Sequence, residues 1–580
     1  MNFLIALFVG AASAFAFEPY ALWPLMPIAF AILCELIARA PTLRRALLVG
    51  WGFAVGQFCI GLNWIATAFT FQAAMPAWLG WIAVVLLSFY LAAFMMLAAG
   101  LAWKFGRERR LALVLALAGG WAICEWLRGT MFTGFAWNPV GVALVDTPWR
   151  ETSATIGTYG LSLFVVLAGG TLWLVTKREW RAPLGFAAIA ALLLTLPDPQ
   201  VFDSTKNGLT VFDVVDSNTA RTPSIVKAVT PPPAPPLPGA PVRSPPPTTP
   251  QMPPEPPLKP GETPPVVDPG FILDRGSRVG RIRIVQPNIG QGDKWREGFA
   301  AVAAQRLASL SQRPFDRDLG PPSVIFWPEA AVTEPLSDER AAATPYIQAE
   351  RARAMRGIFP GTTLVTGGLG LASSDGQTVS GATNSVFILD PRGRLTARYD
   401  KAHLVPYGEY LPLRPILSAI GLSRLAPGDL DFADGPGPRT IALPGGGLMG
   451  LQICYEIIFS GQIVDRAHRP RFVFNPSNDA WFGAWGPPQH LAQARLRAAE
   501  EGLPVIRSTP TGISALIDAR GRLLRSIPAG VAGIIDADIP EAAAWPTPFA
   551  QLGNIIPLAL GFLLLIVTIA LARSGRYRKT

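Results

Sequence analysis

The sequence has few histidines and few cysteines. Only three histidines, His403, His468 and His490, occur in 580 residues, and they lack the ligand spacing of zinc or haem sites. A papain-like cysteine protease needs a histidine with a partnering asparagine or aspartate, and none of the three shows an obvious partner of that kind. The scarcity of histidine therefore argues against a metal site, a haem site and a papain-like protease.

The chain is unusually apolar for a soluble protein. Half of its residues are hydrophobic and its mean hydropathy is +0.32, which indicates a membrane protein. Eight apolar stretches are long enough to span a bilayer, with the first, second and seventh the weakest. They are Asn2–Phe17, Ala21–Ala38, Ala46–Thr67, Trp78–Trp103, Leu111–Leu127, Gly157–Val175, Pro183–Leu196 and Gly553–Ala572. The first could instead be a signal peptide, because Ala12 to Ala16 offers small residues for cleavage, but a basic segment before it is missing.

Basic residues between the spans predict the orientation of the chain. They cluster in alternate loops, which the positive-inside rule places in the cytoplasm. They are Arg39, Arg44, Arg45, Lys104, Arg107, Arg109, Arg110, Lys177, Arg178, Arg181, Arg573, Arg576, Arg578 and Lys579. Both termini are therefore expected inside, and the region from about Pro197 to Gln551 outside.

The net charge of +10 follows from the same loops. They hold 14 of the 50 basic residues, and only Glu108 and Glu179 of the 40 acidic ones. The remainder has 36 basic and 38 acidic residues and is nearly neutral. The charge is thus a signal of membrane topology, and nucleic acid is not an expected partner.

Three of the four cysteines, Cys34, Cys59 and Cys124, lie in predicted spans, which leaves Cys454 as the only thiol of the external region. It has no partner for a disulfide. An unpaired thiol in an oxidising compartment is a liability unless it is buried or used, so a functional cysteine is indicated. The alternative is a free cysteine in the core, a common location for this residue type.

Composition divides the chain into five parts. Residues 1–200 form a predicted membrane domain of seven helices, and residues 201–279 a proline-rich tether. Thr222–Pro269 is about half proline and is expected to be extended and disordered, or less plausibly a ligand for a proline-reading module. Residues 280–550 form a catalytic domain, 551–573 a last membrane helix and 574–580 a basic cytoplasmic tail. Leu209–Val215, which precedes the proline-rich segment, could be a stray strand.

The external domain alternates predicted strands and helices. Arg281–Gln286 and Ser323–Trp327 are predicted strands on either side of a helix at Phe299–Gln312. Asn384–Leu389 and Leu395–Tyr399 flank the turn signature Asp390-Pro-Arg-Gly and are expected to pair as a hairpin. This alternation predicts a layered α/β domain.

Reactive side chains follow three of these strands. Glu329 comes after Trp327-Pro328, Lys401 after Tyr399-Asp400, and Cys454 after the apolar run Leu448–Ile453, at an expected strand-to-helix elbow. A carboxylate can take the thiol proton, and an ammonium can stabilise the oxyanion of a tetrahedral intermediate. The three groups suffice for acyl transfer. Taken singly, Glu329 could be a neighbour of a helix N-cap and Lys401 a solvated surface charge.

Five short segments together resemble the nitrilase, or carbon–nitrogen hydrolase, superfamily. They are Trp327-Pro-Glu329, Tyr399-Asp-Lys401, Leu404-Val-Pro-Tyr-Gly-Glu409, Cys454-Tyr-Glu456 and Asn478-Asp-Ala-Trp-Phe-Gly483. With seven spans before the domain and one after it, the chain is similar to the apolipoprotein N-acyltransferase family of the bacterial inner membrane. The resemblance covers nearly everything except the proline-rich tether, which is longer than expected at that junction.

This resemblance implies an α-β-β-α sandwich and a ping-pong reaction without a cofactor or metal. Cys454 would take an acyl chain from a phospholipid as a thioester and pass it to the α-amino group of an S-diacylglyceryl-cysteine on a diacylated apolipoprotein. Glu329 would be the general base and Lys401 the oxyanion partner. The family pattern assigns supporting or substrate-positioning roles to Trp295, Glu409, Tyr455, Glu456 and, more weakly, Trp481. The catalytic domain is expected on the periplasmic side.

Two other functions remain open from the sequence. A nitrilase-like amidase shares the chemistry, but the eight spans count against a soluble one. A non-enzymatic membrane scaffold would tolerate loss of the Cys454 thiol. Near the outer end of the fifth span, Phe135–Pro139 with Arg128 could line a lipid entrance, although an ordinary interfacial aromatic belt is the favoured interpretation.

Overall fold

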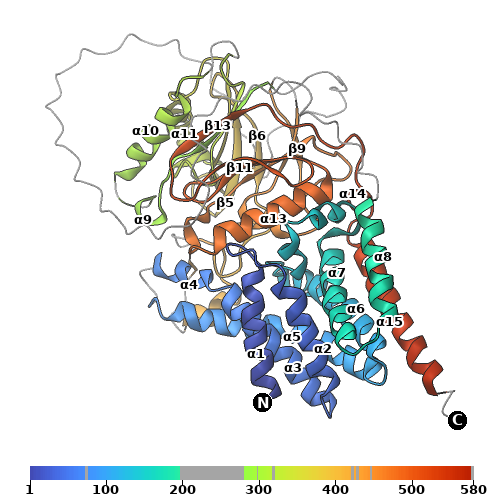
Figure 1. The fold of residues 1–580 in the computed structure, drawn as a ribbon. Coiled ribbons are helices and arrows are strands. Elements are labelled where there is room, and N and C mark those ends of the chain that lie inside the picture. The colour runs from blue at the N-terminus through green and yellow to red at the C-terminus, as the bar shows by residue number, and fades with distance from the viewer. Residues whose placement is uncertain are drawn as a thin grey trace, which may run out of the picture. The chain divides into compact units, whose positions relative to one another are not determined.

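The computed structural model describes residues 1–71, 76–195, 280–294, 296, 298–315, 320–419, 424–425, 430–444 and 447–576 (Figure 1). The predicted tether and the candidate strand Leu209–Val215 lie outside these residues.

All eight apolar stretches contain helices. Their bounds are α1 (Asn2–Ser13), α2 (Leu25–Ala38), α3 (Leu43–Gly61) followed by α4 (Trp64–Ala68), α5 (Leu79–Gly106), α6 (Arg110–Thr130), α7 (Ser153–Thr176), α8 (Arg181–Thr195) and α15 (Ile555–Arg576). By length and composition, α5, α6, α7 and α15 can each cross a membrane, and α3 with the α4 segment forms a fifth candidate that bends by 44°. The helices α1, α2 and α8 are shorter apolar helices, and they correspond to the three weakest stretches of the sequence.

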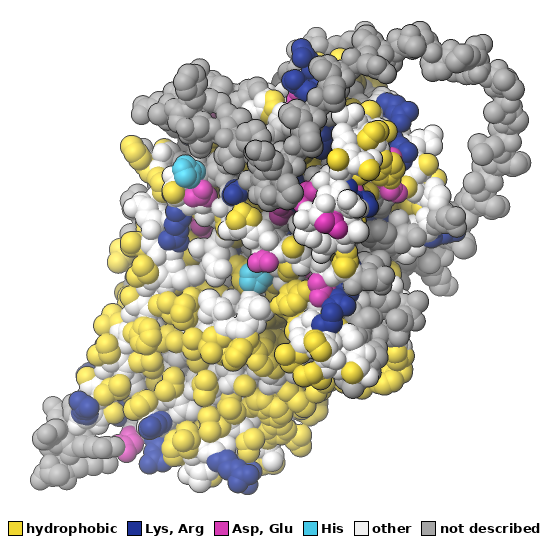
Figure 2. Space-filling model, turned by 180° about the vertical axis from the view of Figure 1, so that it is seen from behind, with side chains coloured by type: hydrophobic (Ala, Val, Ile, Leu, Met, Phe, Trp, Pro, Cys, Tyr) yellow, Lys and Arg dark blue, Asp and Glu magenta, His cyan; other side chains and the backbone are white. Residues whose placement is uncertain are grey.

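The surface of these helices is apolar, as a bilayer requires. Side chains such as Leu86, Phe562 and Ile566 are more than half exposed. Figure 2 shows apolar side chains gathered over the helical part of the molecule, with basic side chains at one end of it. Large exposed apolar areas mark contact with a membrane or a partner, and here they coincide with the predicted spans.

The part of the chain between residues 282 and 537 contains two mixed β-sheets. The first has the strand order β13 (Gly533–Ala537), β1 (Ile282–Gln286), β2 (Val324–Phe326), β4 (Thr363–Ala372), β5 (Gly381–Leu389) and β6 (Leu395–Asp400), and β3 (Pro335–Asp338) also pairs with β4. The second has the order β12 (Leu523–Ile527), β11 (Ser514–Ile517), β10 (Val505–Ser508), β9 (Phe472–Pro476), β8 (Leu448–Leu451) and β7 (Thr440–Ala442). The predicted hairpin is confirmed, because β5 and β6 pair antiparallel around Asp390, whose carboxylate accepts from the backbone N–H groups of Arg392 and Arg394.

The two sheets pack face to face, and helices cover their outer faces. Residues of both sheets, including Phe326, Ile388, Met449 and Phe474, form one buried cluster between them. A second cluster joins the first sheet to α10 (Phe299–Ser311) and α11 (Thr344–Met355). The other outer layer is α13 (Gly486–Glu501), so the α-β-β-α sandwich is confirmed (Figure 1). The shorter helices are α9 (Gln291–Lys294), α12 (Arg414–Ala419) and α14 (Pro548–Leu552).

Helix α13 packs against the membrane helices as well as against the second sheet. Buried residues of α13 and of strands β9 to β11 belong to the same hydrophobic cluster as the helices of residues 1–176. At Gly157, whose φ of 67° interrupts α7, the freed backbone N–H of Thr158 donates to the Glu500 carboxylate at 2.6 Å. Arg497 pairs with the same carboxylate at 2.6 Å. These buried charges are paired, as the low dielectric of the interior demands.

The loop between α6 and α7 is buried at this junction. The indole N–H of Trp137 donates to Gln489 on α13 at 2.8 Å, and Arg128 donates to the backbone carbonyls of Phe135 and Trp137 at 2.9 and 3.0 Å. Trp137 and Arg128 are at most 1% exposed. The sequence predicts either a lipid entrance or an interfacial aromatic belt for Phe135–Pro139. Neither role holds for Trp137, because its ring packs against α13 and is excluded from both lipid and water.

Candidate active site

Cys454 lies at the elbow that the sequence predicts. Strand β8 ends at Leu451, and Cys454 opens the short 3₁₀ helix η10 (Cys454–Ile458) with a φ of 51°. This left-handed conformation costs roughly 1–3 kcal/mol for a residue with a Cβ, so the surrounding contacts must hold it. The side chain is 6% exposed and points toward the gap between the two sheets, where it belongs to the cluster that they share.

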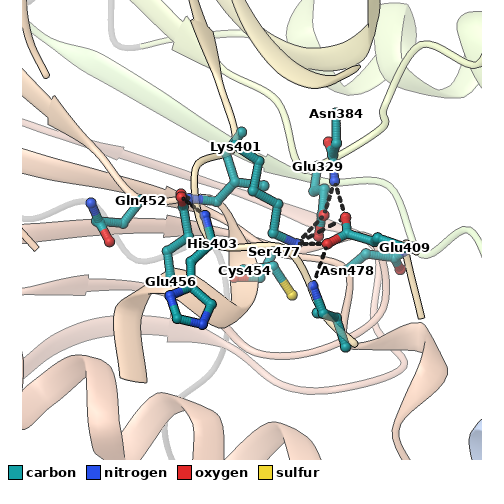
Figure 3. A network of polar contacts seen from close by, with 12 residues as sticks. Glu329, Asn384, Lys401, His403, Glu409, Gln452, Cys454, Glu456, Ser477 and Asn478 are labelled. Atoms are coloured by element: carbon teal, nitrogen blue, oxygen red, sulfur yellow. Dashed lines mark hydrogen bonds and ion pairs between the residues drawn. The ribbon is translucent and has the colours of Figure 1, made fainter. Parts of the chain in front are cut away.

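Four polar side chains form a connected group beside this thiol (Figure 3). The Lys401 ammonium lies 2.9 Å from Glu409 Oε2 and 3.7 Å from Glu329 Oε1. The Asn384 amide donates to Glu329 Oε1 at 2.7 Å and to Glu409 Oε1 at 2.8 Å. All four residues are at most 8% exposed. One ammonium and one amide therefore hold two buried carboxylates in fixed positions, with their charge partly neutralised.

Glu456 joins the loop that follows β6 to the elbow that follows β8. Its carboxylate accepts from the backbone N–H groups of Ala402, His403 and Ile453 at 2.7, 3.0 and 2.6 Å, and from the Tyr399 hydroxyl at 3.0 Å. Burial raises the pKa of Glu456 to about 7, although these backbone donors and Lys401 lower it. Glu456 therefore fixes the spacing between the segments that carry Lys401 and Cys454.

The electrostatics of the site favour a neutral thiol at rest. Burial and the Glu329 carboxylate raise the pKa of Cys454 well above its usual range, whereas the Lys401 ammonium and the backbone N–H of Asn478 lower it. Burial lowers the pKa of Lys401, but the Glu409 and Glu329 carboxylates raise it by more. The net effect is a pKa above the usual value for lysine, so the side chain stays charged. Among the described residues, Glu329 Oε2 has no hydrogen-bond partner, which leaves a lone pair free to accept a proton. A neutral thiol needs a base before it can act as a nucleophile.

The supporting residues taken from the family pattern fall into different places. Glu409 lies in the connected group beside the thiol, and Glu456 lies between the segments that carry Lys401 and Cys454. The Tyr455 hydroxyl points away from it and donates to the backbone carbonyl of Gly134, next to α6, at 3.3 Å. Trp481 packs edge-on against Phe71 at a centroid distance of 5.9 Å. Trp295 lies outside the described residues.

Two polar residues near Glu329, Asn384 and Lys294, were not predicted from the sequence as part of the site. Asn384 could have been noticed only as a polar residue inside the predicted strand Asn384–Leu389. Lys294 is buried, which lowers its pKa to about 8, while the nearby Glu329 carboxylate raises it. Nothing in the local sequence distinguishes this lysine from a solvated one.

The sequence shows no obvious aspartate partner for any histidine, but the structure gives one to His468, 3.0 Å from Asp465, and one to His490. Its Nδ1 lies 2.9 Å from Asp479 Oδ1, and its Nε2 lies 3.0 Å from the backbone carbonyl of Cys454. Potential metal-ligating atoms of Cys454, Asp479 and His490 lie within 4.8 Å of one another. However, the Arg507 guanidinium lies 2.7 Å from Asp479 and 3.0 Å from His490, so a cation already neutralises this group. Because Nε2 faces the peptide carbonyl, His490 does not have the geometry of a base for the thiol.

Family models match both folded parts of the chain. Residues 9–171 match the apolipoprotein N-acyltransferase N-terminal domain, and residues 281–547 match the carbon-nitrogen hydrolase family. The first match contains the helices α2 to α6 and most of α7. The second contains Glu329, Lys401 and Cys454.

Two relatives align with nearly the whole chain. A protein of Rhodopseudomonas palustris named apolipoprotein N-acyltransferase is 32% identical over 98% of this chain and 94% of its own length. One of Bradyrhizobium diazoefficiens with the same name is 32% identical over 97% of this chain and 94% of its own length. Among solved structures, an amidase from Nesterenkonia sp. is 16% identical, covers 48% of this chain and 95% of its own, and has a TM-score of 0.31.

Proposed function

The chain belongs to the apolipoprotein N-acyltransferase family, and from this premise we propose that Cys454 carries the acyl chain between the two substrates. As a member of this family, it is an inner-membrane acyltransferase that acts on lipoproteins. The proposal adds a phospholipid as the acyl donor and the α-amino group of S-diacylglyceryl-cysteine as the acceptor. The observation that carries it is the buried Lys401 ammonium, held between Glu329 and Glu409 beside the only thiol of the external domain.

In the first half-reaction, Glu329 takes the proton of the Cys454 thiol, and the thiolate attacks the ester carbonyl of the phospholipid. The carbonyl oxygen gains negative charge, which the Lys401 ammonium stabilises. When the tetrahedral intermediate collapses, the bond to the leaving oxygen breaks and Glu329 returns the proton to it. The products are a lysophospholipid and a thioester on Cys454.

In the second half-reaction, the α-amino nitrogen of the acceptor attacks the thioester carbonyl. Lys401 again stabilises the oxyanion, and Glu329 takes a proton from the attacking nitrogen. The carbon–sulfur bond breaks, the thiolate regains a proton from Glu329, and the acceptor leaves as an amide. Glu409 does not move a proton in this scheme, and its charge holds the ammonium in place.

Two other functions are not favoured. A nitrilase-like amidase would account for the residues of the site but not for the match over residues 9–171. A membrane scaffold would not require the buried cluster of Glu329, Lys401 and Cys454. The match to named acyltransferases over 98% of the chain covers both parts of the molecule.

Glu329→Gln tests the proposed base. Glutamine can still accept from Asn384, and Lys401 keeps its partner Glu409, so the fold is expected to persist. Loss of the base should slow acylation roughly 10²–10⁴-fold, measured as lysophospholipid release in a single turnover. The matched control is Glu334→Gln, a nearby carboxylate that accepts from the Tyr346 hydroxyl and should leave the rate unchanged. An acylation rate of Glu329→Gln equal to that of the parent protein would remove Glu329 from the mechanism.

We further propose that the catalytic domain faces the periplasm and that both termini are cytoplasmic, on the basis of the alternating basic loops. Alkaline phosphatase folds only outside the cytoplasm, so a fusion joined after Pro260 should be active and one joined after Arg178 silent. The reverse pattern of phosphatase activity would overturn this topology.

A further inference from the structure

A second polar cluster lies behind the backbone of the elbow, on the outer side of the second sheet. It consists of Asp479, which follows β9, His490 on α13 and Arg507 on β10, and each is at most 1% exposed. The proposed acyl-transfer scheme uses none of them. Three fully buried ionisable side chains are costly to place in an interior unless they bind one another or another group.

One hydrogen bond of this cluster reaches the nucleophile itself. His490 Nε2 lies 3.0 Å from the backbone carbonyl of Cys454. A carbonyl oxygen only accepts, so Nε2 carries the hydrogen and donates. This holds whether Nδ1 accepts from Arg507 at 3.0 Å, as in a neutral ring, or donates to Asp479 at 2.9 Å, as in a charged one. Asp479 and Arg507 therefore fix the ring, and the ring fixes the carbonyl.

The ring is also held by packing. Its centroid lies 5.3 Å from that of Trp137, in the buried loop after α6, and 5.9 Å from that of Phe482. Trp137 in turn donates to Gln489, the residue before His490. His490 thus has one tilted and one edge-on aromatic neighbour and hydrogen bonds at both nitrogens, which together restrict its orientation.

Cys454 needs such support because of its backbone conformation. Its φ of 51° is unfavourable for a residue with a Cβ, and hydrogen bonds hold the peptide units on both sides of it. The carbonyl of Ile453, in the peptide unit before Cys454, accepts from the backbone N–H of Glu456 at 3.2 Å, and the carbonyl of Cys454 accepts from His490. In a trans peptide the N–H points opposite to the carbonyl, so the same contact directs the Tyr455 N–H away from His490.

We propose that His490, held by Asp479 and Arg507, is a positioning residue that fixes the Cys454–Tyr455 peptide and thereby aligns the thiol. The inference rests on the proposed function of Cys454 as the acyl carrier. It assigns His490 an effect on both half-reactions, because the same thiol is the nucleophile in one and the leaving group in the other. It assigns His490 no proton transfer and no contact with either substrate.

Two amide substitutions of nearly equal size separate this role from a purely structural one. In His490→Gln the side-chain nitrogen can take the place of Nε2 and donate to the Cys454 carbonyl. In His490→Asn the side chain is one methylene shorter and cannot reach it. Both variants lose the imidazole and its packing against Trp137, so their melting temperatures should fall by similar amounts.

The experiment uses the full-length protein in detergent, mixed phosphatidylethanolamine–phosphatidylglycerol vesicles, and an S-diacylglyceryl-cysteine peptide. We expect His490→Asn to slow both thioester formation and transfer to the peptide roughly 100-fold, with little change in the KM values, since small misplacements of reacting groups have effects of this size. His490→Gln should stay within about fivefold of the parent protein, because it restores the hydrogen bond.

Two results would overturn the inference. One is a His490→Asn protein that acylates as fast as the parent. The other is an equal loss of rate in both variants, which would mean that stability or packing alone accounts for His490. The parent protein tests the underlying proposal separately. If the parent forms no thioester on Cys454, the acyl-carrier role is refuted, and this result does not depend on the variants.

Discussion

Cys454→Ala is expected to abolish both half-reactions. Without the sulfur no thioester forms, so lysophospholipid release and transfer to the diacylglyceryl peptide should both fall by at least about 10⁴-fold. Cys454→Ser should behave in the same way, because an alcohol is a much weaker acid than a thiol and a carboxylate such as Glu329 is too weak a base to deprotonate it. The measurement is release of labelled lysophospholipid, followed in parallel with appearance of the acylated peptide.

The thiols of the membrane helices supply a control for this experiment. Cys59 lies in α3, in a predicted span, and contributes nothing to the site, so Cys59→Ser should retain the parent rates. The Cys454 variants should still fold and insert into the membrane, because the side chain makes no disulfide. Acyl transfer that persists in Cys454→Ala would mean that another nucleophile carries the reaction, or that the substrates react directly.

Lys401→Met is expected to have the second largest effect, on activity and on stability together. The substitution keeps the length of the side chain but removes the charge that stabilises the oxyanion, a loss of roughly 10²–10³-fold in the rate of acylation. It also leaves Glu329 and Glu409 as buried carboxylates without the ammonium, held by the Asn384 amide and, for Glu409, by the Val405 backbone N–H. Breaking a buried ion pair in this way typically destabilises a protein by about 3–5 kcal/mol.

A second substitution separates these two effects. Lys401→Met combined with Glu409→Gln removes one carboxylate along with the ammonium, so the net charge of the group returns to that of the parent and Glu329 is the one carboxylate left in it. The melting temperature should recover toward that of the parent, while acylation stays slow because the oxyanion still lacks its partner. Recovery of acylation in the double variant would show that Lys401 serves only to balance the charge of Glu409.

The parts of the fold that local patterns determine could be predicted from the sequence. The apolar runs predicted helices in all eight stretches as well as strand β8, and the turn signature Asp390-Pro-Arg-Gly predicted the β5–β6 hairpin. The reactive residues follow strands of both sheets: Glu329 follows β2 and Lys401 follows β6 in the first, and Cys454 follows β8 in the second. Only five of the thirteen strands in the described residues, β1, β2, β5, β6 and β8, were predicted from the sequence, and the packing of the two sheets brings Glu329, Lys401 and Cys454 together.

Contacts between distant segments could not be predicted in this way. Asn384 binds Glu329, 55 residues earlier, and His490 binds the Cys454 carbonyl, 36 residues earlier. Periodicity indicates which face of a strand or helix is buried, but it does not say which residue lies opposite. The same limit explains the error at Trp137, whose aromatic neighbours suggested a membrane surface and which is instead covered by α13, more than 300 residues later.

The role of Cys454 as the acyl carrier can be tested most directly by mass spectrometry of the purified protein. After incubation with phospholipid and without acceptor, we expect the mass of one acyl chain on the peptide that contains Cys454, removable by neutral hydroxylamine as a thioester should be. Adding the diacylglyceryl peptide should discharge the adduct and produce one acylated peptide per adduct lost. An adduct on another residue, or turnover in which Cys454 never carries an acyl chain, would contradict the account.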